Sequence, residues 1–442
     1  MTLAFRNHID VTLSVAAQMI VGVTIEPRSR PPLGRLFAGK PAETLLAALP
    51  RLFSLCAIAH QVALLSALEA ARGHQAPPLT RHRRITAVIM ERFAELLRGV
   101  LVSRLACDRS ALAQLQFLLQ AVASLQVSAG AGNARQSRSA TLSQIKMALA
   151  ALGLGSVAEP VVRGTPLASI MDAARRAEAD GGWKQMPAEH GVLSAADDDT
   201  VVARLIDPQA AFAEAPELAG RVPETGVWAR QASRHRHSSA GSVERLLAKL
   251  AELAELLCWI EAGEAEDEAA DQDVVASYAL GPGRGAAAVE CARGRLHHAI
   301  ELDAEGRVRR FEFLAPTEWN FHPRGPVAGS LTGARLCGSA DRAAIEAMIS
   351  SFDPCVGYRL EIGTLSHVAP DALRFCFEAV TANTIARGAA LEIIEQRGTA
   401  WCLSCSRSVE ISQRYDPCPA CGSHQLQVTG GEDMRVKELE VE

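Results

Sequence analysis

Two cysteine pairs near the C-terminal end constrain the fold of this chain more than any other feature. Each pair has the spacing C-x-x-C, in Cys402-Leu-Ser-Cys405 and Cys418-Pro-Ala-Cys421, and twelve residues lie between the pairs. Four thiolates in two tight turns at this spacing can converge tetrahedrally on one Zn²⁺ ion. Gly422 gives the second turn the backbone freedom that it requires. Because cysteine takes all four positions, the predicted zinc site is structural and not catalytic.

The alternative is that these cysteines form two disulfides or are four unrelated thiols. The N-terminal segment carries Arg6, His8 and Asp10 and lacks the plan of a signal peptide, so we expect reduced thiols. The longest apolar stretch, residues 52–68, is interrupted by polar side chains and is shorter than the roughly 18 apolar residues of a membrane helix. We therefore expect a cytoplasmic protein that does not associate with a membrane.

Composition limits the number of domains and the class of partner. The chain has 442 residues, a net charge of −5 and 48% hydrophobic residues, enough for two or three domains with their own cores. The mildly acidic balance does not favour a nucleic-acid binder, since only Arg407 and Arg414 are cationic between the first and last of the four cysteines. The other seven cysteines are scattered, unlike a disulfide framework: Cys56, Cys107, Cys258, Cys291, Cys337, Cys355 and Cys376.

The pattern of apolar and turn residues predicts a mainly helical N-terminal region. The β-branched segment 11–25 is predicted as one strand. Helices are expected at residues 41–49, 52–71, 84–101, 110–127, 141–153 and 242–260. If the second helix already runs at Cys56, that side chain shares a face with His60. Polar loops or linkers are predicted at residues 177–208, 234–237 and 261–273.

Short elements are predicted in the rest of the chain. A hairpin is expected from strand 297–302, the turn Asp303-Ala-Glu-Gly306 and strand 307–313. A helix with Ser339 as its N-cap follows at residues 339–351. Strands at 359–362, 391–395, 425–429 and 435–441, a helix at 370–388 and the zinc ribbon then form a small mixed domain. The fold class is therefore α+β.

Several motifs in the last part of the chain resemble the HypA/HybF family of nickel-delivery proteins for NiFe-hydrogenase maturation. They are Arg359-Leu-Glu-Ile-Gly-Thr-Leu-Ser366, Pro370-Asp-Ala-Leu-Arg-Phe-Cys-Phe-Glu378, the four cysteines and the ending Arg435-Val-Lys-Glu-Leu-Glu-Val-Glu442. The resemblance implies that Cys402, Cys405, Cys418 and Cys421 bind structural zinc.

One departure from that family concerns nickel. Its members begin with Met-His-Glu, and the amino-terminal His region holds Ni²⁺. Here the resemblance starts at Tyr358 with no such triplet before it, and Met1 is followed by Thr2 and Leu3. Nickel binding in the usual manner is therefore not expected.

The preceding residues resemble the large subunit of NiFe hydrogenase, in which R-x-C-G-x-C-x-x-x-H and D-P-C-x-x-C supply four thiolates. The segment from Arg51 to His60 contains Cys56, but Phe53 replaces the first cysteine of that motif. The segment from Asp353 contains Cys355, but Tyr358 replaces the second cysteine. One thiolate of each pair remains, so hydrogen turnover is not expected and the chain is predicted not to be an enzyme.

Two further segments extend this resemblance. Glu290-Cys-Ala-Arg293-Gly294 is similar to E-x-P-R-G, and Pro316-Thr-Glu-Trp-Asn-Phe-His-Pro-Arg324 is similar to P-T-T-W-N-x-x-P-R. In the enzyme that arginine lies over the diatomic ligands of iron, so Arg293 is a third candidate site residue. Cys56 and Cys355 could hold one low-spin iron carrying cyanide and carbonyl, Fe(CN)2CO, because soft thiolate suits that centre. His60 is then either a hydrogen-bond partner of a sulfur or a satisfied core residue.

A degenerate large subunit of this kind resembles the HupK/HoxV accessory proteins. We predict a fusion in which residues 1–357 form the large-subunit-like domain and residues 358–442 a HypA-like domain, with its zinc ribbon at 398–428. The expected function is a scaffold or metallochaperone for assembly of the nickel–iron centre. Its expected partners are the hydrogenase large-subunit precursor and other maturation proteins. The alternative is an interaction adaptor that mimics the large subunit and carries no iron, with Cys56 and Cys355 as inert core thiols.

Overall fold

The chain forms two compact units in the computed structural model. The larger contains residues 1–11 and 16–359, and the smaller contains residues 12–15 and 360–442. The structure describes residues 8–53, 55–105, 109–128, 134–180, 191–207, 211–232, 241–262, 273–336, 341–354, 358–362, 398–402, 404–411, 418–423 and 426–430.

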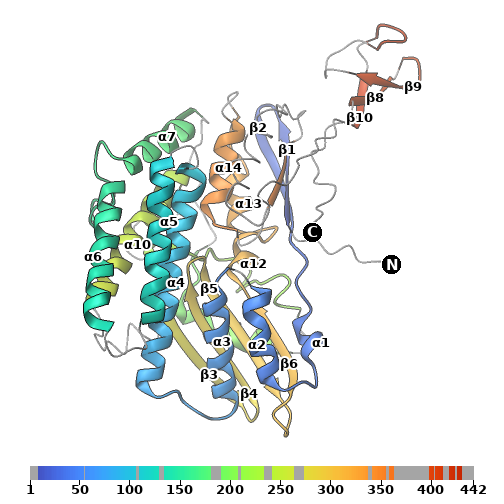
Figure 1. Ribbon diagram of the computed structural model, residues 1–442. Helices are drawn as coiled ribbons and strands as arrows, with labels where there is room; N and C mark the ends of the chain where they lie inside the picture. Colours follow the sequence, from blue (N-terminus) through green and yellow to red (C-terminus); the bar gives the residue numbers. More distant parts are fainter. Residues whose placement is uncertain are drawn as a thin grey trace, which may run out of the picture. The chain divides into compact units, whose positions relative to one another are not determined.

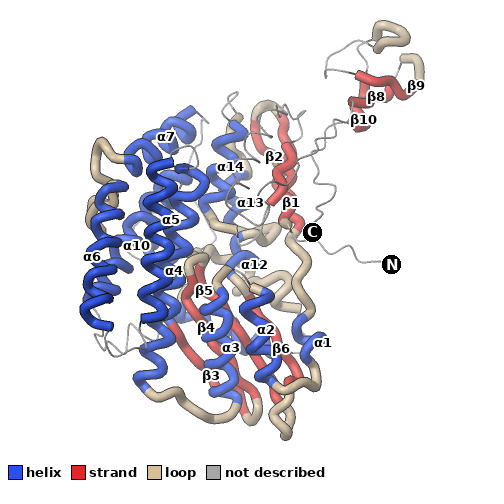
Figure 2. Tube along the Cα trace, in the orientation of Figure 1, coloured by secondary structure: helices blue, strands red, loops and turns tan. Residues whose placement is uncertain are grey.

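Helices dominate the larger unit, as Figures 1 and 2 show. They are α1 (Leu33–Phe37), α2 (Ala42–Leu52), α3 (Ala57–Ala71), α4 (Pro78–Leu105), α5 (Arg109–Ser128), α6 (Ala134–Leu152), α7 (Pro166–Asp180), α8 (Asp198–Ile206), α9 (Val227–Ala232), α10 (Ser242–Ala262), α12 (Pro316–Asn320), α13 (Pro326–Leu331) and α14 (Asp341–Ser351). The long helices α4, α5, α6 and α10 pack together as a bundle beside the sheet of this unit. Among the helices that the structure describes, none combines the length and the apolar run that a membrane crossing needs.

The larger unit contains an antiparallel four-stranded sheet. Its strands are β3 (Val275–Gly281), β4 (Arg284–Cys291), β5 (Gly294–Leu302) and β6 (Val308–Leu314), hydrogen-bonded in that order. The predicted hairpin corresponds to β5 and β6 and is confirmed, as is the α+β class. The two strands before it were missed, because a run of small residues such as 285–288 gives no clear alternation.

Both faces of this sheet are covered, so β4 is buried along almost its whole length. Helix α3 packs on one face, with Ala287 and Ile300 in the larger core, and α8 packs on the other, with Ala286 and Ala299 in the smaller core. The approach of α3 is very close: a Cβ at Gly285 would lie 2.3 Å from a backbone oxygen of α3. Glycine and alanine along β4 therefore bring the N-terminal helices directly onto the strand that ends at Cys291.

Two predicted elements at the start of the chain are corrected. The single strand 11–25 is a hairpin of β1 (Ile9–Ala16) and β2 (Met19–Glu26), which turns at Ala17 and Gln18 with φ of 49° and 60°. Such turns usually contain asparagine or glycine, so these two residues gave no turn signal. The helix expected from residue 52 begins at Ala57, after a break that includes extended backbone at Phe53.

Further along, residues 177–208 are not one loop, because α7 continues to Asp180 and α8 occupies Asp198–Ile206. The side chain of Asp197 accepts a hydrogen bond from the Ser194 backbone amide (2.9 Å) and caps the 3-10 turn Ala195–Asp197, which leads into α8. Helix α6 begins at Ala134 and not at residue 141. The helices predicted at 242–260 and 339–351 are confirmed as α10 and α14, although Ser339 lies outside the described residues.

The smaller unit contains a three-stranded antiparallel sheet around the cysteine pairs. Its order is β10-β8-β9, from β8 (Gly398–Cys402), β9 (Arg407–Ile411) and β10 (Leu426–Gly430). The strands predicted at 425–429 and 359–362 are confirmed as β10 and β7 (Tyr358–Ile362). The elements predicted at 370–388, 391–395 and 435–441, the basic segment 234–237 and most of the acidic run 261–273 lie outside the described residues.

Candidate metal-thiolate sites

Cys56 occupies a strained position at the beginning of α3. It is the N-cap residue, with the left-handed φ of 56°, and its side chain is only 7% exposed. The first amides of the helix, those of Ile58 and Ala59, donate to the Glu91 carboxylate at 2.8 and 2.9 Å. A left-handed non-glycine residue costs about 1–2 kcal/mol, and such strain often collects at functional sites. The fold therefore fixes the position of this thiol, although a glycine here would adopt the same backbone conformation with less strain.

Cys291 brings a second thiol to the same point. It is the last residue of β4 and is 3% exposed, and its thiol and the Cys56 thiol influence each other's pKa. Sequence analysis counted Cys291 among the scattered cysteines. The signal that could have found it is its place two residues before Arg293, inside the motif that was already recognised.

Arg293 donates from Nη1 to Sγ of Cys56 at 3.1 Å and from Nη2 to Glu95 at 3.1 Å. Its Nε is buried and has no partner among the residues that the structure describes. Burial lowers the pKa of Arg293, but the negative charges of Cys56, Glu95 and Asp353 outweigh it and raise that pKa. Two sequence-predicted site residues, Cys56 and Arg293, thus meet in the structure although they are 237 positions apart.

Hydrogen bonding shifts the pKa values of the two thiols in opposite directions. The hydrogen bond with Cys291 and burial raise the pKa of Cys56. The same hydrogen bond lowers the pKa of Cys291. Burial raises the pKa of the nearby Glu91 carboxyl. Of the two thiols, Cys291 therefore loses its proton more readily.

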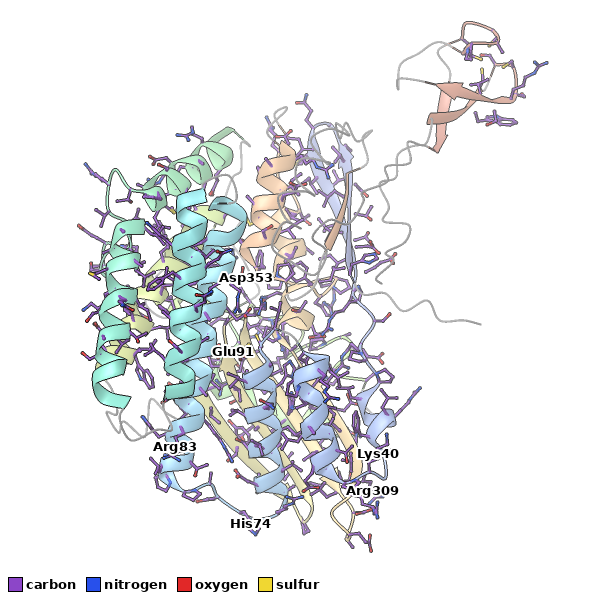
Figure 3. All side chains as sticks on the ribbon, in the orientation of Figure 1. Lys40, His74, Arg83, Glu91, Arg309 and Asp353 are labelled. Atoms are coloured by element: carbon purple, nitrogen blue, oxygen red, sulfur yellow. The ribbon has the colours of Figure 1, made fainter. Side chains whose placement is uncertain are left out.

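Asp353, labelled in Figure 3, is another charged residue near Arg293. It follows α14, has a left-handed φ of 49°, and pairs with Lys249 of α10 at 2.7 Å. Helix α4 passes close by, since a Cβ at Gly99 would lie 3.3 Å from the Asp353 carboxylate. A small cavity of about 20 Å³ lies here, and Arg293, Lys249 and Asp353 are among its lining residues. Cys355, two residues further on, lies outside the described residues, so its predicted role is untested.

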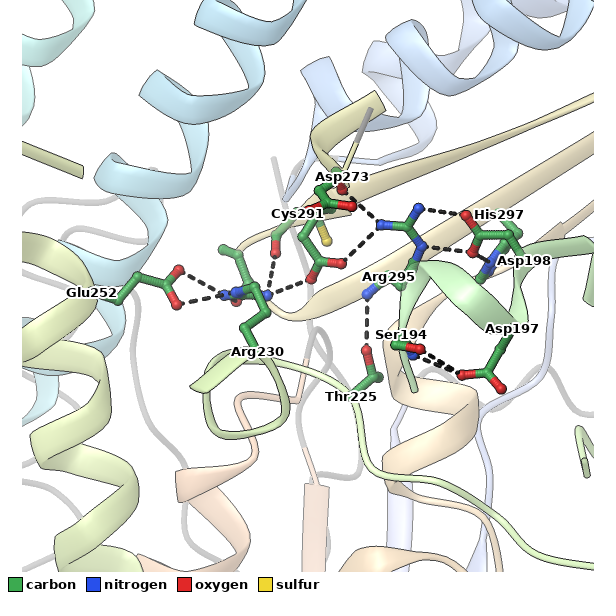
Figure 4. A network of polar contacts seen from close by, with 12 residues as sticks. Ser194, Asp197, Asp198, Thr225, Arg230, Glu252, Asp273, Cys291, Arg295 and His297 are labelled. Carbon is green, nitrogen blue, oxygen red and sulfur yellow. Dashed lines mark hydrogen bonds and ion pairs between the residues drawn. The ribbon is translucent and has the colours of Figure 1, made fainter. Parts of the chain in front are cut away.

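Arg230 fixes the turn between β4 and β5 by hydrogen bonds to its backbone. Arg230 donates to the backbone oxygens of Cys291 and Ala292, and its guanidinium is paired with Glu252 and Glu290 (Figure 4). Burial raises the pKa of Glu252, but the charge of Arg230 outweighs burial and lowers that pKa to about 2. This network fixes the backbone from which the Cys291 and Arg293 side chains project.

The network in Figure 4 continues through Glu290, whose carboxylate accepts hydrogen bonds from both Arg230 and Arg295. Arg295 donates from Nε to Asp198 at 2.6 Å, and His297 contacts the same carboxylate at 2.9 Å. Burial raises the pKa of Asp198, but the hydrogen bonds from Arg295 and His297 outweigh it and lower that pKa to about 2. Sequence analysis missed this cluster, because Asp198 fell in a predicted loop. Its ion pair and hydrogen bonds join α8 to the sheet.

Among the described residues, the side-chain partners of His60 are aromatic rings and not a sulfur. Its Nδ1 lies 2.9 Å from Nε2 of His298, and its ring stacks on Phe53 at 3.6 Å between centroids. Burial lowers the pKa of His60 and lowers that of His298 to about 3. His60 is therefore a satisfied core residue, and Phe53 fills the position of the missing cysteine with packed aromatic surface.

The four C-terminal cysteines form the other thiol cluster. Their sulfurs all lie within 4.8 Å of one another, with 3.6 Å between Cys402 and Cys421 and 3.8 Å between Cys405 and Cys418. Bonds of about 2.3 Å to a tetrahedral Zn²⁺ would place sulfurs ~3.8 Å apart, so the donors fit this ion. A hydrogen bond from the Cys405 backbone amide lowers the pKa of Cys402 to about 7, which favours the thiolate. The arrangement suits a closed structural site.

The second C-x-x-C turn, or knuckle, has the left-handed backbone conformation that Gly422 predicts. Gly422 has φ of 71°, and its amide donates to the carbonyl of Cys418 at 2.8 Å. The two knuckles are joined by the hydroxyl groups of Ser404 and Ser423, 2.7 Å apart. These local contacts bring the two turns, and with them the four sulfurs, together.

Comparisons with known proteins support both the large-subunit resemblance and the HypA-like segment. The model of the nickel-dependent hydrogenase family matches residues 206–358. The model described as hydrogenase/urease nickel incorporation, metallochaperone, hypA matches residues 342–441. The larger unit has the fold of hydrogenase large subunits, as in an NAD⁺-reducing [NiFe]-hydrogenase (TM-score 0.52, 18% identity, covering 76% of this chain and 93% of that one). The [NiFeSe]-hydrogenase of Dm. baculatum is similar too (TM-score 0.50, 14% identity, covering 78% and 95%). The class is thus a hydrogenase large-subunit fold followed by a HypA segment.

Two relatives show the family to which this chain belongs. Hydrogenase expression/formation protein HupK of Bradyrhizobium diazoefficiens is 49% identical over 371 residues, which are 83% of this chain and all of that protein. The hydrogenase maturation factor HypA of Bradyrhizobium sp. is 78% identical over 97 residues, 22% of this chain and 86% of that protein. The chain therefore belongs to the HupK family and carries a HypA-family segment at its C-terminal end, as the predicted fusion requires.

Proposed function

We propose that this chain is a NiFe-hydrogenase maturation accessory protein that carries metal without being an enzyme. Its large-subunit-like domain, residues 1–357, would hold an Fe(CN)2CO fragment as cargo at Cys56 and Cys355. The HypA-like domain, residues 358–442, would be a nickel-insertion-type module folded around structural zinc. Membership of the HupK and HypA families supports the maturation role.

One observation carries the cargo proposal: the buried Cys56 thiol lies 3.1 Å from the Arg293 guanidinium. The soft thiolate suits low-spin iron, and a buried cationic donor suits the nitrogen of bound cyanide. The buried Nε of Arg293, without an acceptor among the described residues, could donate to such a ligand. The site thus offers a soft sulfur donor from Cys56 and cationic N–H donors from Arg293. The strained left-handed backbone at Cys56 fixes the position of the sulfur.

In this role Arg293 would bind and orient the cargo, and the enclosing helices would exclude water from it. The zinc would supply folding energy to the smaller unit and no reaction. We propose as clients the hydrogenase large-subunit precursor and other maturation proteins. Fusion would give the two modules a high effective concentration on one client.

The alternative is an adaptor that binds maturation partners and carries no iron. The stack of Phe53 on His60 favours it to some extent, because apolar surface replaces one thiolate of the large-subunit motif.

Complementation of a strain that lacks the gene tests the proposal. Wild-type protein and Cys258→Ala, in which an exposed thiol on α10 is removed, should restore hydrogenase activity. Cys56→Ala should accumulate to the same level and should not restore it. Normal activity with Cys56→Ala would rule out a cargo site at this thiol.

A further inference from the structure

Helix α10 carries two buried cations one turn apart. Arg245 and Lys249 are 3% and 5% exposed, and their spacing of four residues places them on the same face of the helix. A buried cation is costly unless it is paired, and each of these has a carboxylate partner. Arg245 donates from Nη2 to Glu224 at 2.9 Å, and Lys249 pairs with Asp353 at 2.7 Å. The two cations therefore tie α10 to two distant segments of the chain.

One of these segments is the end of α14. Phe352 and Asp353 follow that helix directly, and the two cations of α10 contact both of them. Cζ of Arg245 lies 3.9 Å from the centroid of the Phe352 ring, which is a cation–π contact. Asp353 has the unfavourable left-handed φ of 49°, and a Cβ at Gly99 of α4 would lie 3.3 Å from its carboxylate. The pair with Lys249 thus holds Asp353 in a strained conformation between α10 and α4.

The other segment leads to Arg293. Glu224, the partner of Arg245, is followed two residues later by Gly226, which has φ of 120°. A Cβ at Gly226 would lie 3.0 Å from the backbone oxygen of Arg293, so the two backbones are in close contact. Arg293 and Asp353 both line the small cavity, together with the two cations of α10. Helix α10 therefore contacts the segments that place both of these charged residues.

We propose that Arg245 and Lys249 are positioning residues of the cargo site, which together set where the Asp353 carboxylate lies relative to the Arg293 guanidinium. The inference deepens the proposed function and rests on it for the nature of the cargo. Arg293 donates to the Cys56 sulfur at 3.1 Å while Lys249 neutralises Asp353. Without Lys249, the buried and unpaired carboxylate would attract the guanidinium away from the sulfur, because charges interact strongly where water is excluded.

Nuclear magnetic resonance of the reduced, full-length chain with isotopically labelled arginine tests this role without any cargo. The side-chain N–H signal of Arg293 is identified by its absence from Arg293→Lys. Lys249→Met should shift this signal because it leaves Asp353 unpaired, and Asp353→Asn should shift it because it leaves Lys249 unpaired. The double variant removes both charges and should reverse more than half of the shift. As a matched control, Lys146→Met removes a lysine from an exposed pair with Glu261 and should leave the signal in place.

Circular dichroism and thermal melting verify that each variant is folded, and Asp353→Asn replaces Lys249→Met in the test if the latter does not fold. An unmoved Arg293 signal in the folded single variant would overturn the proposal. A shift that the double variant does not reverse would also overturn it, because it would show a structural loss and not an imbalance of charge.

Infrared spectroscopy on protein from a host that expresses the hydrogenase maturation genes extends the test to the cargo. Bands of metal-bound cyanide should lie at different frequencies in Lys249→Met and in the wild type, and at the same frequencies in Lys146→Met and the wild type. Identical bands in Lys249→Met would contradict the positioning role. Absence of bands from the wild type would instead refute the proposed function, and the arginine signal would still decide whether α10 positions Arg293.

Discussion

The two thiol clusters of this protein are built in opposite ways. The C-terminal cluster takes its four sulfurs from a stretch of 20 residues, and two short knuckles bring them together. The buried pair joins Cys56 at the start of α3 to Cys291 at the end of β4, 235 positions apart, and only the packed sheet brings them together. We expect the first cluster to fold when it binds metal, whereas the packed sheet positions the two buried thiols. Loss of metal should therefore unfold one region and leave the other standing.

The largest effect is expected when the C-terminal cluster is broken. Cys402→Ser should abolish zinc binding and unfold β8 to β10, because zinc supplies about 10–16 kcal/mol to small domains of this kind. Fluorescence of Trp401, which is partly exposed on β8, reports the loss together with zinc analysis. Thermal melting of the larger unit should not change. A folded, zinc-containing Cys402→Ser protein would contradict the assignment.

Breaking the buried ion pair beside β5 should produce the next largest effect. Asp198→Ala removes the buried carboxylate that Arg295 and His297 share and leaves Arg295 paired with Glu290; breaking a buried pair typically costs about 3–5 kcal/mol. Urea denaturation followed by far-ultraviolet circular dichroism measures the change. As a matched control, Asp172→Ala removes a carboxylate from an exposed pair with Arg175 and should cost less than about 1 kcal/mol. Equal effects of the two substitutions would show that the buried network does not join α8 to the sheet.

Acid should destabilise the larger unit through its buried histidines. Burial holds the pKa of His298 at about 3, well below the value of about 6.5 in an unfolded chain. The unfolded state therefore binds more protons than the folded state between these two values. This contribution to stability is complete above pH 6.5 and declines as the pH falls toward 3. His298→Gln should flatten the dependence of the unfolding free energy on pH in this window, and a slope as steep as that of the wild type would contradict it.

The smallest effect concerns the strain at Cys56. Because glycine adopts the left-handed φ of 56° without a steric penalty, Cys56→Gly should be more stable than Cys56→Ala by about 1 kcal/mol. Denaturant midpoints of the two variants give the difference, and Gly39→Ala, at φ of 74° with open space around its Cα, is a matched control for the penalty. If Cys56→Ala were the more stable variant, the strain would not be real and would no longer indicate a chemical role for the thiol.

The sequence predicted the sites that depend on local spacing and failed where tertiary packing decides. The C-x-x-C pairs gave the four-cysteine cluster, and the motifs around Cys56 and Arg293 gave two residues that prove to be in contact. Cys291 was overlooked because a lone cysteine carries no periodic signal. The role of His60 was also decided by its partner His298, which only the packing of α3 on β5 brings within 2.9 Å.

Infrared spectroscopy with metal analysis tests the central claim most directly. The protein would be purified without oxygen from a host that expresses the hydrogenase maturation genes, in the wild-type form and as Cys56→Ala and Cys258→Ala. The account predicts bands of metal-bound cyanide and carbonyl, with iron, in the wild type and Cys258→Ala, and their loss in Cys56→Ala. Zinc alone, with no such bands in the wild type, would contradict the cargo site and favour the adaptor.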